Sequence, residues 1–252
     1  MPALAMTEAQ RTPPLPMLLS EAARSAFEWT AGLASAAWLA SAPRGDGQPV
    51  LVLPGLFATD AYTATTRAFL RAMGFDARPW RGGRNRGDWD ALERVVLPAI
   101  RRLHAETGQR VALVGASMGG LYAREAARRL PQVVRCVVTL ASAASGPHRA
   151  NHVWPAFEAV TGQPAEMLAV APPPVPSTSV YSRCDGLSDW RPCLQRGSER
   201  TENVEVASSH LGMAWHPAVL YLLADRIAQA EGQWRPFVPP AEAAHWYAGP
   251  SR

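Results

Sequence analysis

The chain has 252 residues, 48% of them hydrophobic and 18% charged, with a formal net charge of +4 at pH 7. This length allows one sizeable core without requiring two domains, and the composition excludes an intrinsically disordered chain. All of the basic charge comes from arginine, in short doublets such as 101–102 and 128–129, which we interpret as solvated helix faces. No basic stripe is interleaved with aromatic residues, so we expect no nucleic-acid partner.

Residues 1–47 are predicted to form a leader and a helix packed on the domain. The proline-rich piece at 12–16 is interpreted as flexible, and the uncharged stretch WTAGLASAAWLASA (29–42) as a helix too short to cross a bilayer. Peripheral membrane contact is the alternative for this stretch, and stable insertion is not expected. No basic segment precedes an apolar core at the N-terminus, so we expect no secretory signal and a cytoplasmic protein.

Residues 48–252 are predicted to form one α/β domain with a short insertion around 143–176. Near-continuous apolar runs separated by helical patterns favour a doubly wound, mostly parallel sheet of about six strands, covered on both faces. The strands are expected at 49–55, 75–80, 111–115, 134–141, 179–183 and 203–208, and the helices at 62–73, 89–104, 117–130, within 153–160 and at 217–230.

The stretch VALVGASMGG (111–120) places three glycines around one hydroxyl, where a strand becomes a helix. Such a turn forces its central residue toward strained backbone angles and crowds the positions two residues to either side, which here are Gly115 and Gly119. Gly-x-Ser-x-Gly in this context is a nucleophile elbow, so Ser117 is the candidate nucleophile. A glycine-rich turn with Ser117 as a helix N-cap is the alternative interpretation.

A serine nucleophile needs a base, and the base needs a carboxylate to orient it. In a parallel sheet such groups gather at the carboxyl ends of the strands. Asp185 follows the run SVYSR and His210 follows NVEVAS, in the order Ser, Asp, His that this architecture requires. Gly186 and Gly212, just beyond them, are expected to ease tight turns.

Each of these choices has a competitor. Asp189 lies four residues beyond Asp185 and is interpreted as a cap at the start of a helix. The other histidines are placed as follows: His216 at a helix start, His245 in the tail, His104 within a helix, and His148 and His152 in the loop after 134–141, where they could line a pocket.

An oxyanion hole needs two backbone N–H groups aimed at the developing charge. We expect one from Met118, directly after the nucleophile, and one from Leu56, in the loop after the first strand, where Gly55 permits close approach of the backbone. The stretch RGGRNRG (81–87) is interpreted as a hydrogen-bonded surface loop, with contact to a polar substrate group as the alternative.

Three apolar residues are candidates for binding an acyl chain. Trp154 and Phe157 lie at helical spacing in the insertion, and Phe57 could form the opposite wall. Little chain is left in the insertion for a cap, so an open, shallow cleft is expected. The three cysteines form no metal-ligand pattern, so we predict no metal, and a Cys184–Cys193 disulfide stays open.

The set VLVLPGLF, VGASMGG, VYSRCDG and SSHLGM resembles the α/β-hydrolase superfamily, and within it the small bacterial lipases and esterases with a minimal cap. The resemblance covers roughly 48–230 and is stronger for the superfamily than for the lipase subgroup. It implies a cofactor-independent serine hydrolase whose triad is Ser117, Asp185 and His210 and whose substrate is a small-molecule or lipid carboxylic ester. Residues 48–252 would then be the catalytic domain.

The sequence departs from many lipases at the oxyanion loop, where they have His-Gly and this chain has Pro54-Gly55. The backbone donor survives this change, and a perhydrolase side activity stays open. An acyltransferase or thioesterase with the same triad is the alternative enzyme. A binding protein of the same fold without turnover is the alternative outside enzymes.

Overall fold

The computed structural model describes residues 11–143, 151–153, 155, 158–159, 162, 172–195 and 199–248. Its centre is a sheet with strand order β2-β1-β3-β4-β5-β6-β7. The pairs from β2 to β6 are parallel and β7 joins β6 antiparallel, which confirms the predicted mostly parallel α/β sheet. The strands are β1 (Pro49–Leu53), β2 (Asp76–Pro79), β3 (Val111–Ala116), β4 (Val134–Leu140), β5 (Ser177–Tyr181), β6 (Thr201–Val206) and β7 (Tyr247–Ala248).

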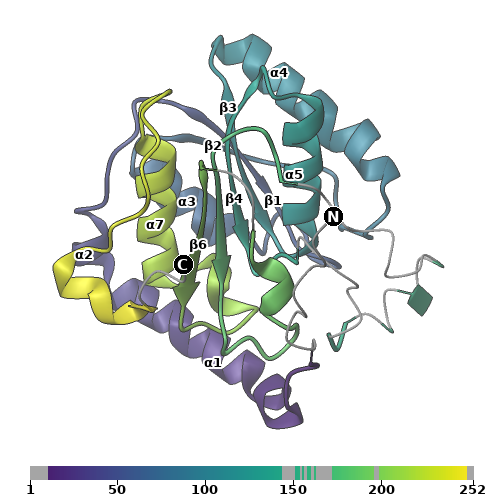
Figure 1. Cartoon of the computed structure of the whole chain (residues 1–252), viewed down its shortest axis with the longest axis vertical. Helices are drawn as coiled ribbons and strands as arrows, with labels where there is room; N and C mark the ends of the chain where they lie inside the picture. Colours follow the sequence, from purple (N-terminus) through teal and green to yellow (C-terminus); the bar gives the residue numbers. More distant parts are fainter. Residues whose placement is uncertain are drawn as a thin grey trace, which may run out of the picture.

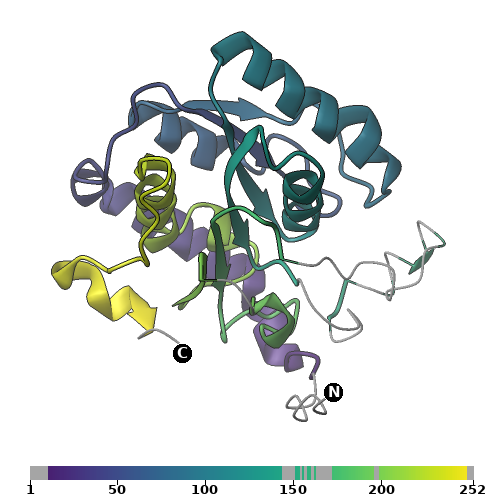
Figure 2. The same ribbon diagram turned by 45° about the horizontal axis from the view of Figure 1, so that its top comes forward.

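Helices cover both faces of the sheet, as Figure 2 shows. On one face lie α3 (Ala64–Ala72) and α7 (Pro217–Ala228), and on the other α4 (Leu97–Thr107) and α5 (Met118–Arg129). Alternate side chains of β1 point to opposite faces: Val50 and Val52 enter the core under α3 and α7, whereas Leu51 and Leu53 enter the core under α4 and α5. Burial on both faces explains why the strands read as continuous apolar runs.

The predicted helix at 89–104 divides into two parts. A π-helical segment, η1 (Leu92–Val96), precedes α4, and Pro98 occupies the first turn of α4. Proline has no N–H and its ring crowds the preceding turn, so it is best tolerated where a regular helix begins. The amphipathic pattern identified the helix but not this change of hydrogen bonding.

The C-terminal tail contains a strand that the sequence pattern did not reveal. A 3-10 helix, η5 (Ala241–Trp246), leads into β7, which has only two residues and is too short to show a period. The Tyr247 hydroxyl donates to the carbonyl oxygen of Ala218 at 2.7 Å and ties the tail to α7.

The N-terminal helix is longer than predicted. Helix α1 (Leu15–Ala34) begins inside the proline-rich piece, with Pro16 in its first turn, and α2 (Ala36–Leu39) follows. In Figure 1, α1 (purple) passes beneath the arrowheads of the central strands, at their carboxyl ends. No helix in the described ranges is long and apolar enough to cross a membrane.

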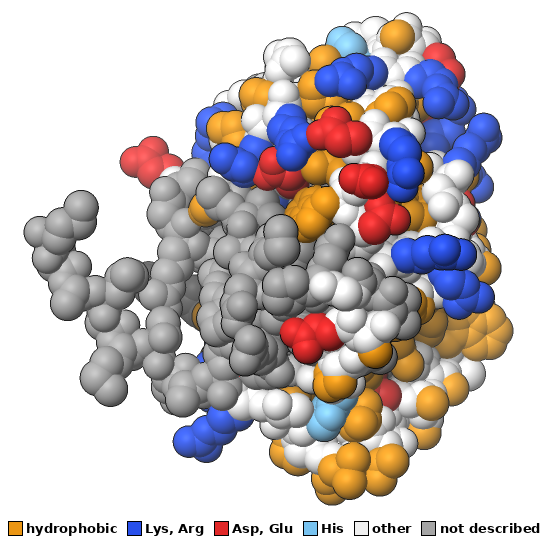
Figure 3. Space-filling view, turned by 90° about the vertical axis from the view of Figure 1, so that its right-hand side faces the viewer, with side chains coloured by type: hydrophobic (Ala, Val, Ile, Leu, Met, Phe, Trp, Pro, Cys, Tyr) orange, Lys and Arg blue, Asp and Glu red, His pale blue; other side chains and the backbone are white. Residues whose placement is uncertain are grey.

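Acidic and basic side chains alternate on the side of the molecule that carries α4 and α5 (Figure 3). Ion pairs join Arg129 to Glu125 at 2.7 Å and Arg94 to Asp88 at 3.5 Å. Exposed pairs of this kind contribute little to stability. The doublet at 128–129 therefore shares the carboxylate of Glu125, and the arginines of this face are mixed with acidic side chains.

Candidate active site

Ser117 occupies the sharp turn between β3 and α5, with φ 48° and ψ −118°. A positive φ is strained for a residue with a side chain, as predicted for the elbow. A Cβ on Gly119 would lie 2.5 Å from the carbonyl oxygen of Leu53, and one on Gly115 would overlap the backbone of Gly119, so both glycines are required by space. The Ser117 side chain makes no cap hydrogen bond to α5, which argues against the N-cap interpretation.

Asp185 and His210 meet at the carboxyl ends of β5 and β6. Nδ1 of His210 lies 2.6 Å from Oδ2 of Asp185, and the two residues are only 9% and 4% exposed. Oδ1 of Asp185 accepts the backbone N–H groups of Leu187 and Ser188, each at 2.8 Å. The carboxylate is thus fixed in the loop and turned toward the imidazole, and the Ser188 hydroxyl lies 3.3 Å from its Oδ2.

The pKa of His210 is raised above its usual value of 6.5. Burial acts to lower the pKa, because it disfavours the cation. The charge of Asp185, its hydrogen bond to the ring and the charge of Glu21 act in the opposite direction and outweigh burial. The surroundings of His210 therefore favour the imidazolium that a general base forms during a reaction.

The competing residues have structural partners elsewhere. Oδ1 of Asp189 accepts the backbone N–H and the guanidinium of Arg191, each at 3.1 Å, just ahead of the three-residue 3-10 helix η3 (Arg191–Cys193). Nδ1 of His216 accepts the N–H of Ala218 at the start of α7, and burial lowers the pKa of His216 to about 4. The remaining histidines are His104, bound to the Gln109 carbonyl, His152, bound to the Pro13 carbonyl, His245, beside Trp246, and His148, outside the described residues.

The two expected oxyanion donors lie beside Ser117. A Cβ on Gly55 would be 3.3 Å from the Cβ of Ser117, so the loop after β1 touches the elbow. Within the described part of the chain, neither the N–H of Leu56 nor that of Met118 has an acceptor, and both residues line the same cleft as Ser117. Two unpaired backbone donors next to a hydroxyl are what an oxyanion site requires.

The loop at 81–87 supports the loop after β1. The buried side chain of Asn85 donates to the Pro54 carbonyl at 2.8 Å. The backbones exchange two more bonds, from Phe57 N–H to the Asn85 carbonyl (2.7 Å) and from Asn85 N–H to the Ala58 carbonyl (2.8 Å). Asn85 was not predicted as a site residue. Its only signal in the sequence is an amide side chain within a glycine- and arginine-rich loop.

A cleft of about 160 Å³ opens beside Ser117 and His210. Phe57 is not among the described residues that line it, and Trp154 and Phe157 lie outside the described residues, as does most of the insertion at 143–176. The apolar side chains that do line it are Leu56, Ala58, Tyr62, Met118, Leu121, Ala141, Ala143, Val153, Leu187 and Leu211.

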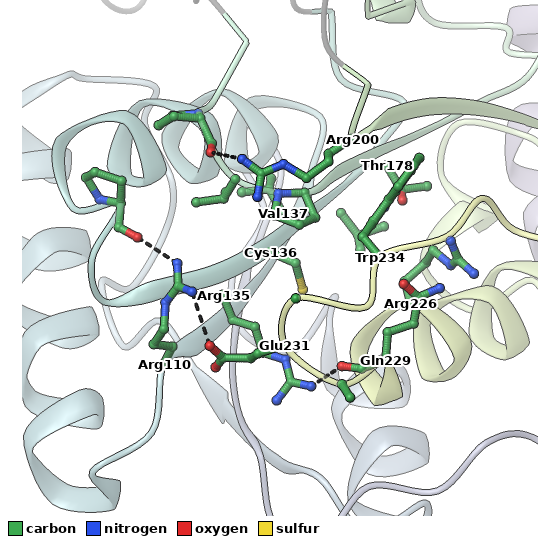
Figure 4. Close-up of a pocket in the computed structure, with 17 residues that line it drawn as sticks. Arg110, Arg135, Cys136, Val137, Thr178, Arg200, Arg226, Gln229, Glu231 and Trp234 are labelled. Carbon is green, nitrogen blue, oxygen red and sulfur yellow. Dashed lines mark hydrogen bonds and ion pairs between the residues drawn. The ribbon is translucent and has the colours of Figure 1, made fainter.

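A second cavity, of about 210 Å³, lies at the opposite end of the sheet (Figure 4). Its arginines are held by the protein: Arg110 by Glu231 at 3.2 Å and Arg135 by the Gln229 carbonyl. Burial raises the pKa of the Cys136 thiol there to about 11, which disfavours the reactive thiolate. The Cys136 thiol of this cavity is thus not an activated nucleophile, whereas the cleft of about 160 Å³ contains Ser117 and His210.

The described residues contain neither a disulfide nor a metal-ligand cluster. Cys184 is exposed, Cys193 is buried, and both are free thiols, so the disulfide that the sequence left open is not formed. No group of three His, Cys, Asp or Glu residues in the described ranges could hold a metal ion.

The fold can be compared with those of known proteins. No family model matches the sequence, and no curated protein matches it. Among solved structures, the lipase B of Aspergillus fumigatus superposes with a TM-score of 0.58 at 17% identity, over 73% of this chain and 53% of that one. The chain has the α/β-hydrolase fold.

Two other structures with the α/β-hydrolase fold extend the comparison. A pyrethroid hydrolase gives a TM-score of 0.51 at 14% identity over 72% of this chain and 96% of its own. A type II thioesterase from the borrelidin biosynthetic cluster gives 0.50 at 17% identity over 73% and 93%. The chain spans about half the length of the lipase and nearly the whole length of these two hydrolase-fold proteins.

Proposed function

We propose that this chain is a serine hydrolase that cleaves carboxylic esters through an acyl-enzyme intermediate. The observation that carries the proposal is the 2.6 Å contact between His210 and Asp185, in a cleft that also contains Ser117 on a strained strand-to-helix turn. These are the three groups of a nucleophile, base and orienting acid, in the chain order used by this fold.

In this mechanism the Ser117 hydroxyl attacks the acyl carbonyl and passes its proton to Nε2 of His210. Asp185 accepts a hydrogen bond from Nδ1–H, which fixes the tautomer with the lone pair on Nε2 and stabilises the imidazolium. Since the pKa of His210 is already raised by Asp185 and Glu21, the ring gains a proton more readily than a free imidazole.

The negative charge that develops on the carbonyl oxygen is accepted by the N–H groups of Leu56 and Met118. These donors have no competing acceptor in the described chain, so binding the oxyanion breaks no existing hydrogen bond. His210 then protonates the leaving alcohol, and water attacks the acyl-enzyme with His210 again as the base.

The lining and the volume of the cleft fit a substrate with an apolar acyl group of modest size. Its volume of about 160 Å³ is small beside the roughly 300–1,000 Å³ of typical small-molecule sites. The side chains of Leu121, Leu187 and Leu211 offer apolar contact, and none of the three carries a charge. We expect esters of short to medium acyl chains to be better substrates than long ones.

The nature of the reaction is tested with an active-site fluorophosphonate and a nitrophenyl ester on the purified chain. The proposal predicts covalent labelling and ester turnover, both lost in Ser117→Ala and both kept in Ser41→Ala, which removes an exposed serine. A chain that neither reacts with the probe nor hydrolyses the ester would instead be a binding protein. A parallel panel of esters, thioesters and amides separates an esterase from a thioesterase.

A further inference from the structure

Helix α1 presents two buried carboxylates to the active-site loops. Glu21 and Glu28 are only 3% and 7% exposed, and they lie seven residues apart, which places them on the same face of the helix. They are the only acidic residues of α1. A carboxylate is costly to bury unless hydrogen bonds satisfy it, so the partners of these two residues indicate what the helix does.

Glu21 joins the loop of the acid to the loop of the base. Its Oε1 accepts the N–H of Gly186 at 2.8 Å and the N–H of His210 at 3.1 Å, and its Oε2 accepts the N–H of Leu211 at 3.1 Å. Gly186 follows Asp185 directly in the chain. One carboxylate therefore holds backbone groups next to both members of the Asp185–His210 pair.

Arg24 of the same helix also binds the loop that carries Asp185. Its guanidinium lies 2.8 Å from Oε1 of Glu21 and donates to the carbonyl of Cys184 at 2.6 Å. Cys184 precedes Asp185 in the chain. The acid loop is thus held on both sides of Asp185, by Arg24 before it and by Glu21 after it.

Glu28 holds the other side of the base. Its Oε1 accepts the N–H of Ser209 at 2.6 Å, and its Oε2 lies 2.6 Å from the Ser209 hydroxyl and 3.3 Å from that of Ser208. Burial raises the pKa of Glu28 more than these hydrogen bonds lower it. The residue before His210 is therefore bound to α1 through both its backbone and its side chain.

Two glycines provide independent support for this arrangement. Neither Gly186 nor Gly212 has a positive φ, so the expectation that they ease tight turns is wrong. A Cβ on Gly186 would lie 2.5 Å from the Met17 carbonyl oxygen of α1, and one on Gly212 would overlap the Glu28 carboxylate. Both loops therefore lack a side chain at the point where α1 approaches them.

We propose that Glu21 is a positioning residue for the Asp185–His210 pair and that α1, far from the triad in sequence, is part of the catalytic centre. This inference rests on the proposed function for its catalytic meaning. Glu21 fixes the two loops relative to each other, and so fixes the direction from which the carboxylate meets the imidazole. Small displacements of such a pair lower rates strongly, by about a hundredfold for roughly 1 Å.

The charge of Glu21 has a second effect on His210. Among the residues that the structure describes, the charged or titratable groups around His210 are Asp185 from the loop after β5, Glu21, Glu28 and Arg24 from α1, and Tyr62, whose hydroxyl binds the Leu211 carbonyl at 3.0 Å. Glu21 raises the pKa of His210, as does Asp185. Removing the charge of Glu21 should therefore lower the pKa of His210 while Asp185 remains in place.

The first test compares Glu21→Gln with Asp46→Asn, which removes the same charge from an exposed turn ahead of β1. In Glu21→Gln we expect kcat to fall about ten- to a hundredfold with KM changed less than about twofold. The acid limb of the pH profile of kcat/KM should move to lower pH. Asp46→Asn should match the wild type in all three measurements.

A second variant separates position from charge and covers the case in which Glu21→Gln does not fold. Glu21→Asp keeps the charge but shortens the side chain by one methylene group. It should lower kcat while leaving the pH midpoint close to that of the wild type. A merely structural role would instead lower the melting temperature of both variants and leave kcat and the pH midpoint of the folded protein unchanged, which would overturn the proposal.

The last test does not depend on turnover. Hydrogen exchange and an NMR titration of the histidines are measured on the full chain, with His210 assigned from His210→Gln. In Glu21→Gln the amides of Gly186, His210 and Leu211 should exchange faster, and the His210 pKa should fall. If the wild-type chain shows no ester turnover, the proposed function is wrong, but the role of Glu21 in joining the two loops can still hold. If amide exchange and the His210 pKa are unchanged in Glu21→Gln, the role of Glu21 is wrong even in an active enzyme.

Discussion

The side-chain amide of Asn85 donates a hydrogen bond to the carbonyl oxygen of Pro54 at 2.8 Å, one residue before Gly55, which lines the same cleft as Ser117. Asn85 is fully buried, and its Oδ1 in turn accepts the N–H of Gly87 at 2.9 Å. The position of the loop that carries the Leu56 N–H thus depends on a side chain 31 residues beyond Pro54, in the loop after β2.

We predict that Asn85→Ala lowers kcat through the oxyanion loop. The change leaves the Pro54 carbonyl without its buried donor, which costs about 1–3 kcal/mol, and frees the loop that aims Leu56 N–H at the oxyanion. Ester turnover and thermal melting are measured beside Arg86→Ala, an exposed neighbour in the same loop that should behave as wild type. Equal kcat in the two variants would show that the backbone bonds of this loop are sufficient.

Ser117→Ala and His210→Ala should each remove nearly all ester turnover without unfolding the chain. In the proposed mechanism Ser117, His210 and Asp185 act as a unit, so each single loss is expected to be on the order of a thousandfold or more, and the double variant should be little worse than either. Turnover is measured on samples whose circular dichroism matches the wild type. Turnover that persists in folded Ser117→Ala would require a different nucleophile.

Substitution of Asp185 should mainly lower activity, whereas substitution of Asp189 should mainly lower stability. Asp185→Asn should lose far more activity than Asp189→Asn, because only Asp185 binds the imidazole. Asp189→Asn replaces a buried carboxylate that binds Arg191 and the N–H of Arg11. This should lower the free energy of unfolding by about 1–3 kcal/mol. Urea unfolding and kcat/KM of both variants test this, and the opposite order of activity would exchange their roles.

The sequence predicted the elements whose pattern is local. Continuous apolar strands and the Gly-x-Ser-x-Gly turn identify the sheet, Ser117 and the strand ends at which Asp185 and His210 lie, since chain order and the carboxyl-end rule suffice for this. The sequence did not reveal the roles of Glu21, Glu28 and Asn85, because the residues that they bind lie far away in the chain. The spacing of Glu21 and Glu28 was the one visible signal, but a pair of acids on one helix face is more often solvated.

Activity should rise with pH as His210 loses its proton, whereas the contribution of His210 to stability should fall over the same pH range. Its pKa is raised above 6.5, and a base must be neutral, so kcat/KM should rise with pH through a midpoint above 6.5. A group with a raised folded pKa contributes stability that is fully present below its unfolded pKa and is lost as pH rises through its folded pKa. The contribution of His210 to the free energy of unfolding should therefore decline as activity appears.

Both quantities are measured on the same preparations. The first is the pH profile of kcat/KM for the wild type, and the second is the difference in urea stability between wild type and His210→Gln at pH 6 and pH 9. We expect this difference to favour the wild type more at pH 6.

The variant Asp185→Asn removes the charge that raises the pKa of His210 most, whereas burial still lowers this pKa. The pKa of the ring should therefore fall, and the residual activity should extend to lower pH. A midpoint below 6.5 in the wild type would mean that burial outweighs Asp185 and Glu21 in the folded protein, and that the carboxylates orient His210 without making it a stronger base.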